Sequence, residues 1–167
     1  MMAKTLEKRV VRGILFKGEM VRKILSDEKT QTRRAVNPQS MVGHVGGSVV
    51  DRCPYGAVGD RLWVRETWGL HYGVVYRATD TARPSGGWKP SIHMPRKFSR
   101  ILLEITDVRV ERLQKITHED AVAEGIPNLP GAQAEYRILW DRINGKRKGL
   151  AWADNPWVWA LAFRRMR

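Results

Sequence analysis

Alternation of apolar and polar residues is the strongest structural signal in the sequence. The stretch RILLEITDVRVERL (100–113) alternates along much of its length, as strands do when one face is buried and the other meets solvent. In the closing stretch PWVWALAFRRMR (156–167), both faces of the predicted strand are apolar until Arg164. Further strands are predicted at 10–16, 29–36, 61–68 and 73–79, with the last two as neighbours.

Short helices are predicted between these strands. Residues 18–28 place an apolar stripe opposite charged residues, which is typical of an amphipathic helix. Thr117 is a suitable N-cap, Asp120 completes a capping box, and Gly125 is a C-terminal stop. A third helix is predicted over 132–145, which gives three short helices in all.

The order of these elements favours an α+β fold. Half-buried strands and few, short helices predict a small mixed β-barrel with the helices packed on it, and argue against a doubly wound sheet. Stretches rich in proline and glycine at 37–60 and 80–99 are predicted to be long loops. We expect residues 10–167 to form a single domain, preceded by a flexible basic leader at 1–9.

The chain is strongly basic, and its charge is unevenly placed. Thirty lysines and arginines against 17 acidic residues give a net charge of +13. The segments 1–34 and 137–167 each carry a net +6, whereas 35–136 carry +1. If the two basic segments meet in the fold, one face would attract nucleotides or phosphate-bearing polymers. The alternative is that the charge serves solubility alone.

Cysteine and histidine give no support for a metal or disulfide site. Cys53 is the only cysteine, and the four histidines show no metal-ligand spacing, so we expect no cofactor and no metal. No stretch approaches the roughly 18 to 20 apolar residues that span a bilayer. The basic start lacks the apolar core of a secretory signal. A cytoplasmic protein without a membrane partner is the expectation.

Residues 27–34, DEKTQTRR, resemble the signature G-x-K-x-x-x-x-R of the ASCH (activating signal cointegrator homology) family, relatives of the PUA RNA-binding domains. Lys29 and Arg34 match, whereas Asp27 stands where the family has glycine. The stretches GDRLWVRETW, THEDAVAEGI and NPWVWALAFRR resemble further family segments, so the resemblance covers residues 10–165. The long stretches at 37–58 and 80–98 resemble ASCH proteins of tailed phages and prophages.

The resemblance implies a PUA-like barrel whose cleft receives a nucleoside or RNA. In bacterial members of the family that are amidohydrolases, a lysine, a threonine three residues later and a glutamate in a later helix remove the acetyl group from N4-acetylcytidine. The resemblance carries these catalytic roles to Lys29, Thr32 and Glu124.

The residue types fit amide hydrolysis. A threonine hydroxyl needs a base, and Lys29 can serve only when neutral, so its pKa must fall below about 10.4. Arg33 and Arg34 favour that fall because like charge opposes the ammonium form. Glu124 would protonate the departing amine. Because Lys29 and Thr32 would point to opposite faces of a regular strand, their convergence requires a bend at 29–32.

Further residues are candidates for binding the substrate. Arg33 and Arg34 are interpreted as phosphate-binding or structural. Trp63 is a further candidate for binding the substrate. Glu66, on the same predicted strand, either pairs with an arginine of the barrel or hydrogen-bonds a base edge. Trp88 lies in a loop rich in proline and glycine and is the candidate to stack on a base.

Three functions fit the sequence. The chain could be an amidohydrolase acting on acetylated cytidine, a metal-independent ribonuclease using Lys29, or a noncatalytic RNA-binding module. The Lys/Thr/Glu set favours the first function and the charge of +13 favours the other two. A substrate that is modified RNA or a nucleotide would reconcile both signals. The expected partners are therefore RNA, a nucleotide or a modified nucleoside, and the oligomeric state is left open.

Overall fold

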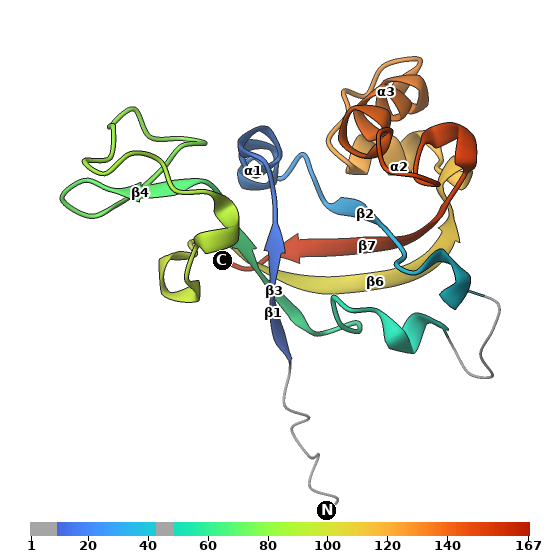
Figure 1. Ribbon diagram of the computed structural model, residues 1–167, viewed down its shortest axis with the longest axis horizontal. Coiled ribbons are helices and arrows are strands. Elements are labelled where there is room, and N and C mark those ends of the chain that lie inside the picture. The colour runs from blue at the N-terminus through green and yellow to red at the C-terminus, as the bar shows by residue number, and fades with distance from the viewer. Residues whose placement is uncertain (1–9, 43–48) are drawn as a thin grey trace, which may run out of the picture.

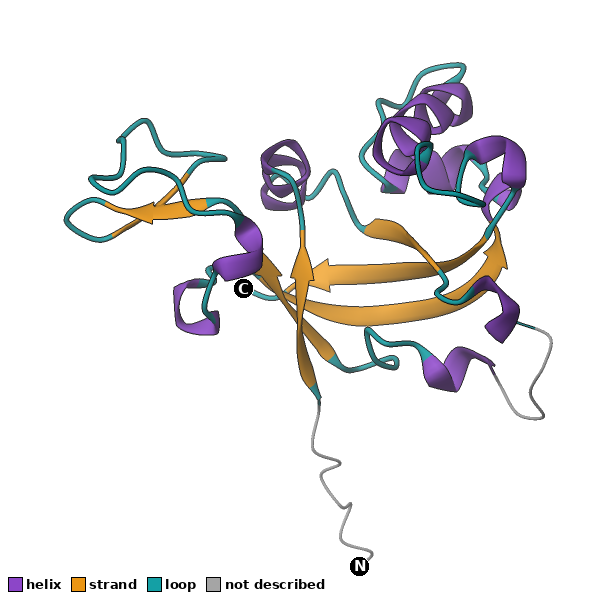
Figure 2. Ribbon diagram, viewed as in Figure 1, coloured by secondary structure: helices purple, strands orange, loops and turns teal. Residues whose placement is uncertain are grey.

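A curved five-stranded sheet forms the centre of the molecule (Figures 1 and 2). The computed structural model describes residues 10–42 and 49–167, so the predicted leader at 1–9 and residues 43–48 of the first predicted loop lie outside the described residues. The sheet has the order β1-β3-β6-β7-β2. β1 and β3 are parallel, and the other pairs are antiparallel. The strands are β1 (Val11–Leu15), β2 (Gln31–Ala35), β3 (Arg61–Arg65), β6 (Leu102–Arg112) and β7 (Trp157–Arg165).

The three predicted helices are confirmed: α1 (Gly18–Leu25), α2 (His118–Ala123) and α3 (Ala132–Asn144). The capping box between Thr117 and Asp120 is present at the start of α2. Figure 1 shows α1 and the α2/α3 pair on the same side of the sheet, with β2 between them. Among the described residues, no helix has the length and apolar character needed to cross a membrane.

The two faces of β7 meet different cores because its residues alternate. Trp159, Leu161 and Phe163 join the main core with α1 and the inner residues of β3 and β6. Val158 joins a second core formed with α2 and α3. Ala160, on the same face as Val158, lies opposite Arg33 of β2. A small side chain at this position leaves space above the sheet for a large guanidinium group.

The open edges of the sheet, β1 and β2, are bridged by a side chain. Arg34 of β2 donates from Nη2 to the carbonyl oxygen of Leu15 in β1, at 2.6 Å. Its guanidinium also lies over the Phe16 ring, 5.0 Å from the ring centroid. The α+β prediction is confirmed, and the sheet is a partly open barrel in which β1 and β2 share no backbone ladder.

The predicted pairing of strands 61–68 and 73–79 needs a correction. The first strand divides at Glu66, and its end forms a separate hairpin of β4 (Trp68–Leu70) and β5 (Val74–Tyr76). β3 pairs with β1 and β6 instead. The division has a physical cause, because the backbone N–H of Glu66 faces the sulfur of Met94 rather than a strand carbonyl. The hairpin projects from the sheet (Figure 1).

The two predicted loops contain short 3-10 turns and pack differently. The described part of the first loop lies against the main core through apolar side chains, among them Met41, Val50 and Tyr55. The second loop returns to the hairpin, where Lys89 forms an isolated bridge with Trp68. One loop therefore closes the core, and the other enlarges the projection that begins at β4.

Candidate active site

A buried ion pair joins the turn before β2 to the end of α2. Nζ of Lys29 lies 2.7 Å from Oε2 of Glu124 and donates a second hydrogen bond to the Glu124 carbonyl at 2.8 Å. The side chains are only 3% and 4% exposed. The backbone fixes the pair, because Thr30 N–H donates to the Ala123 carbonyl at 2.8 Å. Two of the three residues assigned to catalysis are thus in direct contact.

Two residues with left-handed backbones shape the segments that hold this pair. Gly125 has φ +95, and a Cβ there would approach Lys23 Cδ to 2.9 Å. Asp27 has φ +60, which explains why glycine suits this position of the signature. Aspartate tolerates this conformation better than most residues. Its carboxylate also binds Arg165 at 3.2 Å and Arg167 at 2.9 Å, and these bonds lower the pKa of Asp27.

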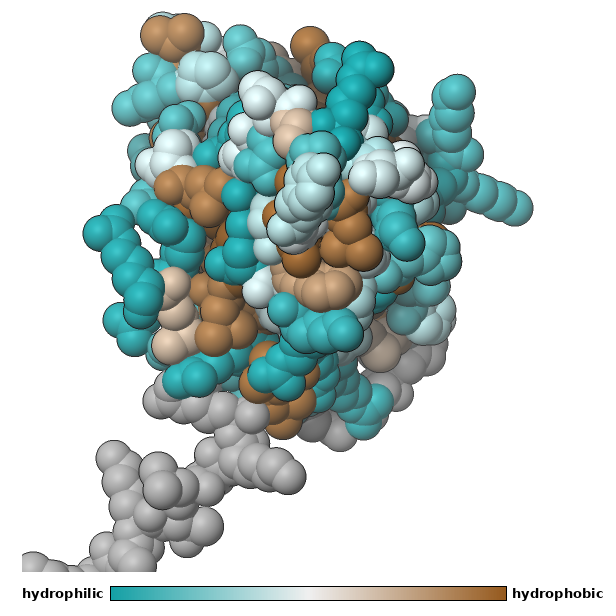
Figure 3. Space-filling view, turned by 90° about the vertical axis from the view of Figure 1, so that its left-hand side faces the viewer, coloured by the Kyte–Doolittle hydropathy of each residue, from teal (hydrophilic) through white to brown (hydrophobic). Residues whose placement is uncertain are grey.

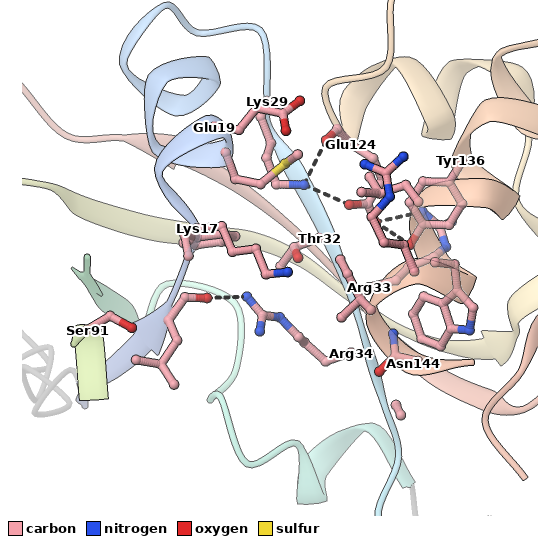
Figure 4. Close-up of a pocket in the computed structure, with 18 of the residues that line it drawn as sticks. Lys17, Glu19, Lys29, Thr32, Arg33, Arg34, Ser91, Glu124, Tyr136 and Asn144 are labelled. Atoms are coloured by element: carbon pink, nitrogen blue, oxygen red, sulfur yellow. Dashed lines mark hydrogen bonds and ion pairs between the residues drawn. The ribbon is translucent and has the colours of Figure 1, made fainter. Parts of the chain in front are cut away.

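Lys29 and Thr32 line the same cavity, which has a volume of about 710 Å³. β2 begins at Gln31, so the alternation of a strand does not apply to Lys29. Figure 4 shows the Thr32 side chain beside the Lys29 ammonium in this cavity, with Glu124 across from it. Among the described residues, the Thr32 hydroxyl makes no hydrogen bond. The turn before β2 lies at 26–27 rather than at the predicted 29–32, and residues 28–30 precede the strand without being part of it.

Arg33 is the centre of a buried network on the face of β2 that α2 covers. Its side chain is 0% exposed and lies 2.7 Å from Glu111, 2.8 Å from Asp120 and 3.5 Å from Glu124. Its Nη1 also donates to the amide oxygen of Gln31. The two terminal nitrogens of Arg33 are therefore engaged by the protein, whereas its buried Nε has no hydrogen-bond partner among the described residues. Arg33 contacts Glu124 and also belongs to the lining of the cavity.

Burial and neighbouring charge shift the pKa values in the site. Burial lowers the pKa of Lys29, with Arg34 and Lys23 acting in the same direction and Glu124 opposing them. Burial also opposes the charge of Arg33, but Glu124 and the other carboxylates outweigh it and raise the pKa of Arg33. Burial first, and then Glu124, raise the pKa of Tyr136 well above 10.0. The fall for Lys29 is in the direction that a lysine base requires.

The rim of the cavity is cationic and is built from both basic ends of the chain. β2 pairs with β7, so the basic segments 1–34 and 137–167 do meet in the fold. Four cations of the lining form no ion pair among the described residues, namely Lys17, Arg34, Arg142 and Arg147. The cavity therefore offers charge to an anionic ligand beside the Lys29–Glu124 pair.

Three predicted binding residues lie outside the lining of this cavity. Trp63 pairs in register with Gly13 of β1, and the Arg65 guanidinium covers its ring at 5.3 Å. Glu66 is 1% exposed and accepts two hydrogen bonds from Arg100, at 2.9 and 3.0 Å, so the structure corresponds to the alternative of an arginine partner. Trp88 is half-buried in the second loop.

Other residues of the site were missed by the sequence reasoning. Tyr136, which lies in the helix predicted over 132–145, donates its hydroxyl to Glu124 at 3.4 Å. Asp120, predicted only as a cap, also binds Arg33. Within residues 10–42 and 49–167, no group of three or more His, Cys, Asp or Glu side chains is placed to hold a metal ion.

Solved structures with the same fold are found by comparison. An ASCH domain from Lactobacillus crispatus JV V101 matches with a TM-score of 0.50 and 16% sequence identity, over 93% of this chain and 79% of that one. A protein from Enterococcus faecalis V583, of the DUF984 family, matches with a TM-score of 0.50 and 11% identity, over 96% and 82%. No protein-family model and no curated protein matches the sequence. The chain has the fold of an ASCH domain, which confirms the fold implied by the signature at 27–34.

Proposed function

We propose that the protein hydrolyses an amide on a modified nucleotide or RNA base of the N4-acetylcytidine type, with Lys29, Thr32 and Glu124 as catalytic residues. The observation that carries this proposal is the 2.7 Å contact between Lys29 and Glu124 in a cavity that Thr32 also lines. The cavity volume of about 710 Å³ lies within the usual range for small-ligand sites.

The Lys29–Glu124 pair can supply the base and the acid together. Lys29 donates a proton to Glu124 in their hydrogen bond. Transfer of this proton to Glu124 makes Lys29 a neutral amine and leaves both groups uncharged. Burial favours the neutral form of Lys29 because desolvation penalises its charge.

Acylation of Thr32 follows from this arrangement. Neutral Lys29 accepts the hydroxyl proton while Oγ1 of Thr32 attacks the acetyl carbonyl carbon. Arg34, on the same cavity wall, provides a cation for the oxyanion that forms. Glu124 then protonates the departing exocyclic nitrogen as the C–N bond breaks. The step leaves an ester on Thr32 and returns Lys29 and Glu124 to their charged forms.

Hydrolysis of the ester restores the site. Water attacks the ester carbonyl and gives its proton to the Glu124 carboxylate. The ester C–O bond then breaks, and the Lys29 ammonium returns a proton to the Thr32 oxygen. The products are acetic acid and the free amine, and the pair again holds one shared proton.

The cationic rim favours a substrate that carries phosphate. A free nucleoside has no negative charge to balance Lys17, Arg142 and Arg147, which line the cavity without ion pairs among the described residues. A nucleotide or RNA can place phosphate against these side chains while its base enters toward Lys29. This reading reconciles the charge of the chain with the catalytic residue types.

The test is acetate release from N4-acetylcytidine, its 5′-monophosphate and an acetylated RNA oligonucleotide, each with and without EDTA. We expect the phosphorylated substrates to give higher kcat/KM than the nucleoside. Lys29→Met should lower kcat by a factor on the order of 10² to 10⁴. Lys115→Met, at an exposed position, is the matched control and should retain activity.

Three outcomes would contradict the proposal. Cleaved RNA without acetate release would favour the metal-independent ribonuclease. Binding of RNA with neither product would leave a noncatalytic RNA-binding module. Full deacetylation by Lys29→Met would remove the assigned role of Lys29.

A further inference from the structure

The part of the molecule that projects from the sheet at β4 is strongly basic, although it belongs to the segment 35–136, whose net charge is only +1. Residues 68–99, here called the lobe, comprise the β4–β5 hairpin and the loop that follows it. The lobe contains a single acidic residue and five basic residues, namely Arg77, Arg83, Lys89, Arg96 and Lys97. All five basic residues are exposed, and none forms an ion pair with a carboxylate among the described residues. Figure 3 views this end of the molecule and shows hydrophilic side chains projecting around a few hydrophobic ones.

The acidic residue of the lobe does not neutralise these cations. The carboxylate of Asp80 accepts hydrogen bonds from the backbone N–H of Tyr76 at 2.8 Å and from the Thr79 hydroxyl at 3.1 Å. Asp80 therefore serves the turn after β5. The net +4 of the lobe remains available to an anionic partner.

Aromatic rings hold two of the cations in defined positions. The rings of Trp68 and Phe98 are in contact, with centroids 4.9 Å apart. The Lys89 ammonium lies 5.3 Å from the Trp68 ring, and the Lys97 ammonium lies 5.0 Å from the Phe98 ring. The loop is also tied to the barrel, since Arg65 donates to the Ile92 carbonyl. Lys89 and Lys97 are therefore packed on aromatic rings, and the loop that carries them is fixed to the barrel.

An exposed aromatic ring marks the tip of the lobe. Tyr72, in the turn between β4 and β5, has a relative exposure of 105%. Its neighbour His71 contacts the Tyr72 ring edge-on at a centroid distance of 5.0 Å. An exposed aromatic ring next to cations is the combination that single-stranded nucleic acids require: a surface for base stacking and charges for phosphate.

The lobe leads into the catalytic cavity. Ser91 from the lobe and Thr67, which immediately precedes it, both line the 710 Å³ cavity. Figure 4 shows Ser91 on the side of the cavity opposite Asn144 of α3. The lobe and the Lys29–Glu124 pair therefore contribute to the lining of the same cavity.

We propose that the lobe binds single-stranded nucleic acid, with phosphates on Arg83, Lys89 and their neighbours and a base stacked on Tyr72. Trp88, predicted from the sequence to stack on a base, belongs to the same lobe. The partner is single-stranded because the bases of a duplex are not free to stack on an exposed ring. This site is distinct from the catalytic cavity, and binding to it does not depend on the proposed hydrolysis.

The experiment is fluorescence anisotropy with labelled single-stranded RNA and DNA of roughly twelve nucleotides, and with a duplex of the same sequence. Two lobe variants are compared with the wild-type chain: Arg83→Glu combined with Lys89→Glu, and Tyr72→Ala. Arg52→Glu combined with Lys115→Glu changes the net charge equally at exposed positions outside the lobe. Titrations between about 50 and about 200 mM salt give the salt dependence of Kd.

The two lobe variants should weaken single-strand binding in different ways. The double reversal should weaken single-strand binding about tenfold or more and reduce the slope of log Kd against log salt by about two. Tyr72→Ala should weaken binding about fivefold or more with the slope unchanged, because stacking involves no counterion release. The control reversal should weaken binding less than either variant. Comparison of RNA with DNA shows which sugar the lobe prefers.

The proposal is overturned by three results. These are no binding by the wild-type chain, equal losses in the lobe and control reversals, or tighter binding of the duplex than of single strands. Lys29→Met separates this proposal from the previous one, because it should lose hydrolysis and keep the single-strand affinity. If hydrolysis is never detected, the anisotropy results still decide the role of the lobe.

Discussion

The ammonium of Lys29 and the carboxylate of Glu124 are 95 residues apart in the sequence and 2.7 Å apart in space, almost completely removed from solvent. A buried pair of this kind gains little net stability, because its attraction must offset the loss of hydration of both charges. The pair also shares the carboxylate with Arg33 at 3.5 Å and Tyr136 at 3.4 Å. The net contribution of this pair to stability is therefore expected to be small, whereas the loss of one partner is expected to be costly.

Replacing only Lys29 or only Glu124 should lower the free energy of unfolding more than replacing both residues. Lys29→Met leaves the Glu124 carboxylate buried without its main partner, and we expect a loss of about 3 kcal/mol in the free energy of unfolding. Lys29→Met combined with Glu124→Gln should be more stable than the sum of the two single effects predicts. Urea denaturation measures the cycle. As a control, Arg164→Met, which breaks the exposed pair with Glu104, should lower the free energy of unfolding by less than about 1 kcal/mol. If the effects of Lys29→Met and Glu124→Gln are simply additive, the two residues are not coupled and the prediction is wrong.

The reaction should slow on the alkaline side. Both arrangements of the Lys29–Glu124 pair hold one proton, so activity is lost when that proton leaves. Burial lowers the pKa of Lys29 below its ordinary value of 10.5, and kcat/KM should therefore fall with a midpoint below 10.5. A pH profile corrected for uncatalysed hydrolysis checks this. A rate that instead rises through this range would mean that Lys29 acts as the base without a protonated Glu124.

Two substitutions of Asp27 can separate the energetic cost of its left-handed backbone from the contribution of its ion pairs. Asp27→Ala and Asp27→Gly both remove the bonds to Arg165 and Arg167, but only glycine relieves the cost of φ +60. We expect Asp27→Gly to be more stable than Asp27→Ala by about 1 kcal/mol. Thermal or urea unfolding of the two variants gives the difference directly. Equal stabilities would show that the turn relaxes when the carboxylate is lost.

Ionisation of Tyr136 should lower the free energy of unfolding as the pH rises into the alkaline range. Its pKa is raised above 10.0 in the folded protein, so the folded state keeps a proton that the unfolded state loses. The stability from this group is fully present below pH 10.0 and is lost as pH rises toward the folded value. Between about pH 8 and about pH 11, the free energy of unfolding should therefore fall more for the wild-type chain than for Tyr136→Phe.

Tyr72→Phe, at a fully exposed position, is the matched control for that measurement. Both variants remove one hydroxyl, but only Tyr136 has its hydroxyl buried against Glu124. A difference for Tyr136→Phe that stays constant over this pH range would contradict the raised pKa.

Local patterns predicted much of the fold because each depends on nearby residues. Alternation placed the long strand at 100–113, and the structure has β6 at Leu102–Arg112. The cap and stop signals placed α2 correctly. The split at Glu66 escaped prediction because its cause is a sulfur atom on Met94, 28 residues away in the sequence.

The site was predictable in its residue types but not in its connections. The signature gave Lys29 and Arg34, the resemblance to the amidohydrolase members gave Thr32 and Glu124, and all four line the same cavity. The network around Arg33 joins Glu111 and Asp120 across 78 and 87 residues. No local pattern in one sequence encodes such separations. Glu66 could be described only by alternatives, because its partner Arg100 is 34 residues away.

The hydrogen bond from Arg34 to Leu15 means that one side chain sets how far apart the two free edges of the sheet stand. Bare strand edges invite pairing with other chains, and a shorter residue at position 34 would leave both edges of this barrel less protected. Because Arg34 also lines the cavity, a shorter residue there would enlarge the cavity and at the same time raise the tendency of the protein to self-associate.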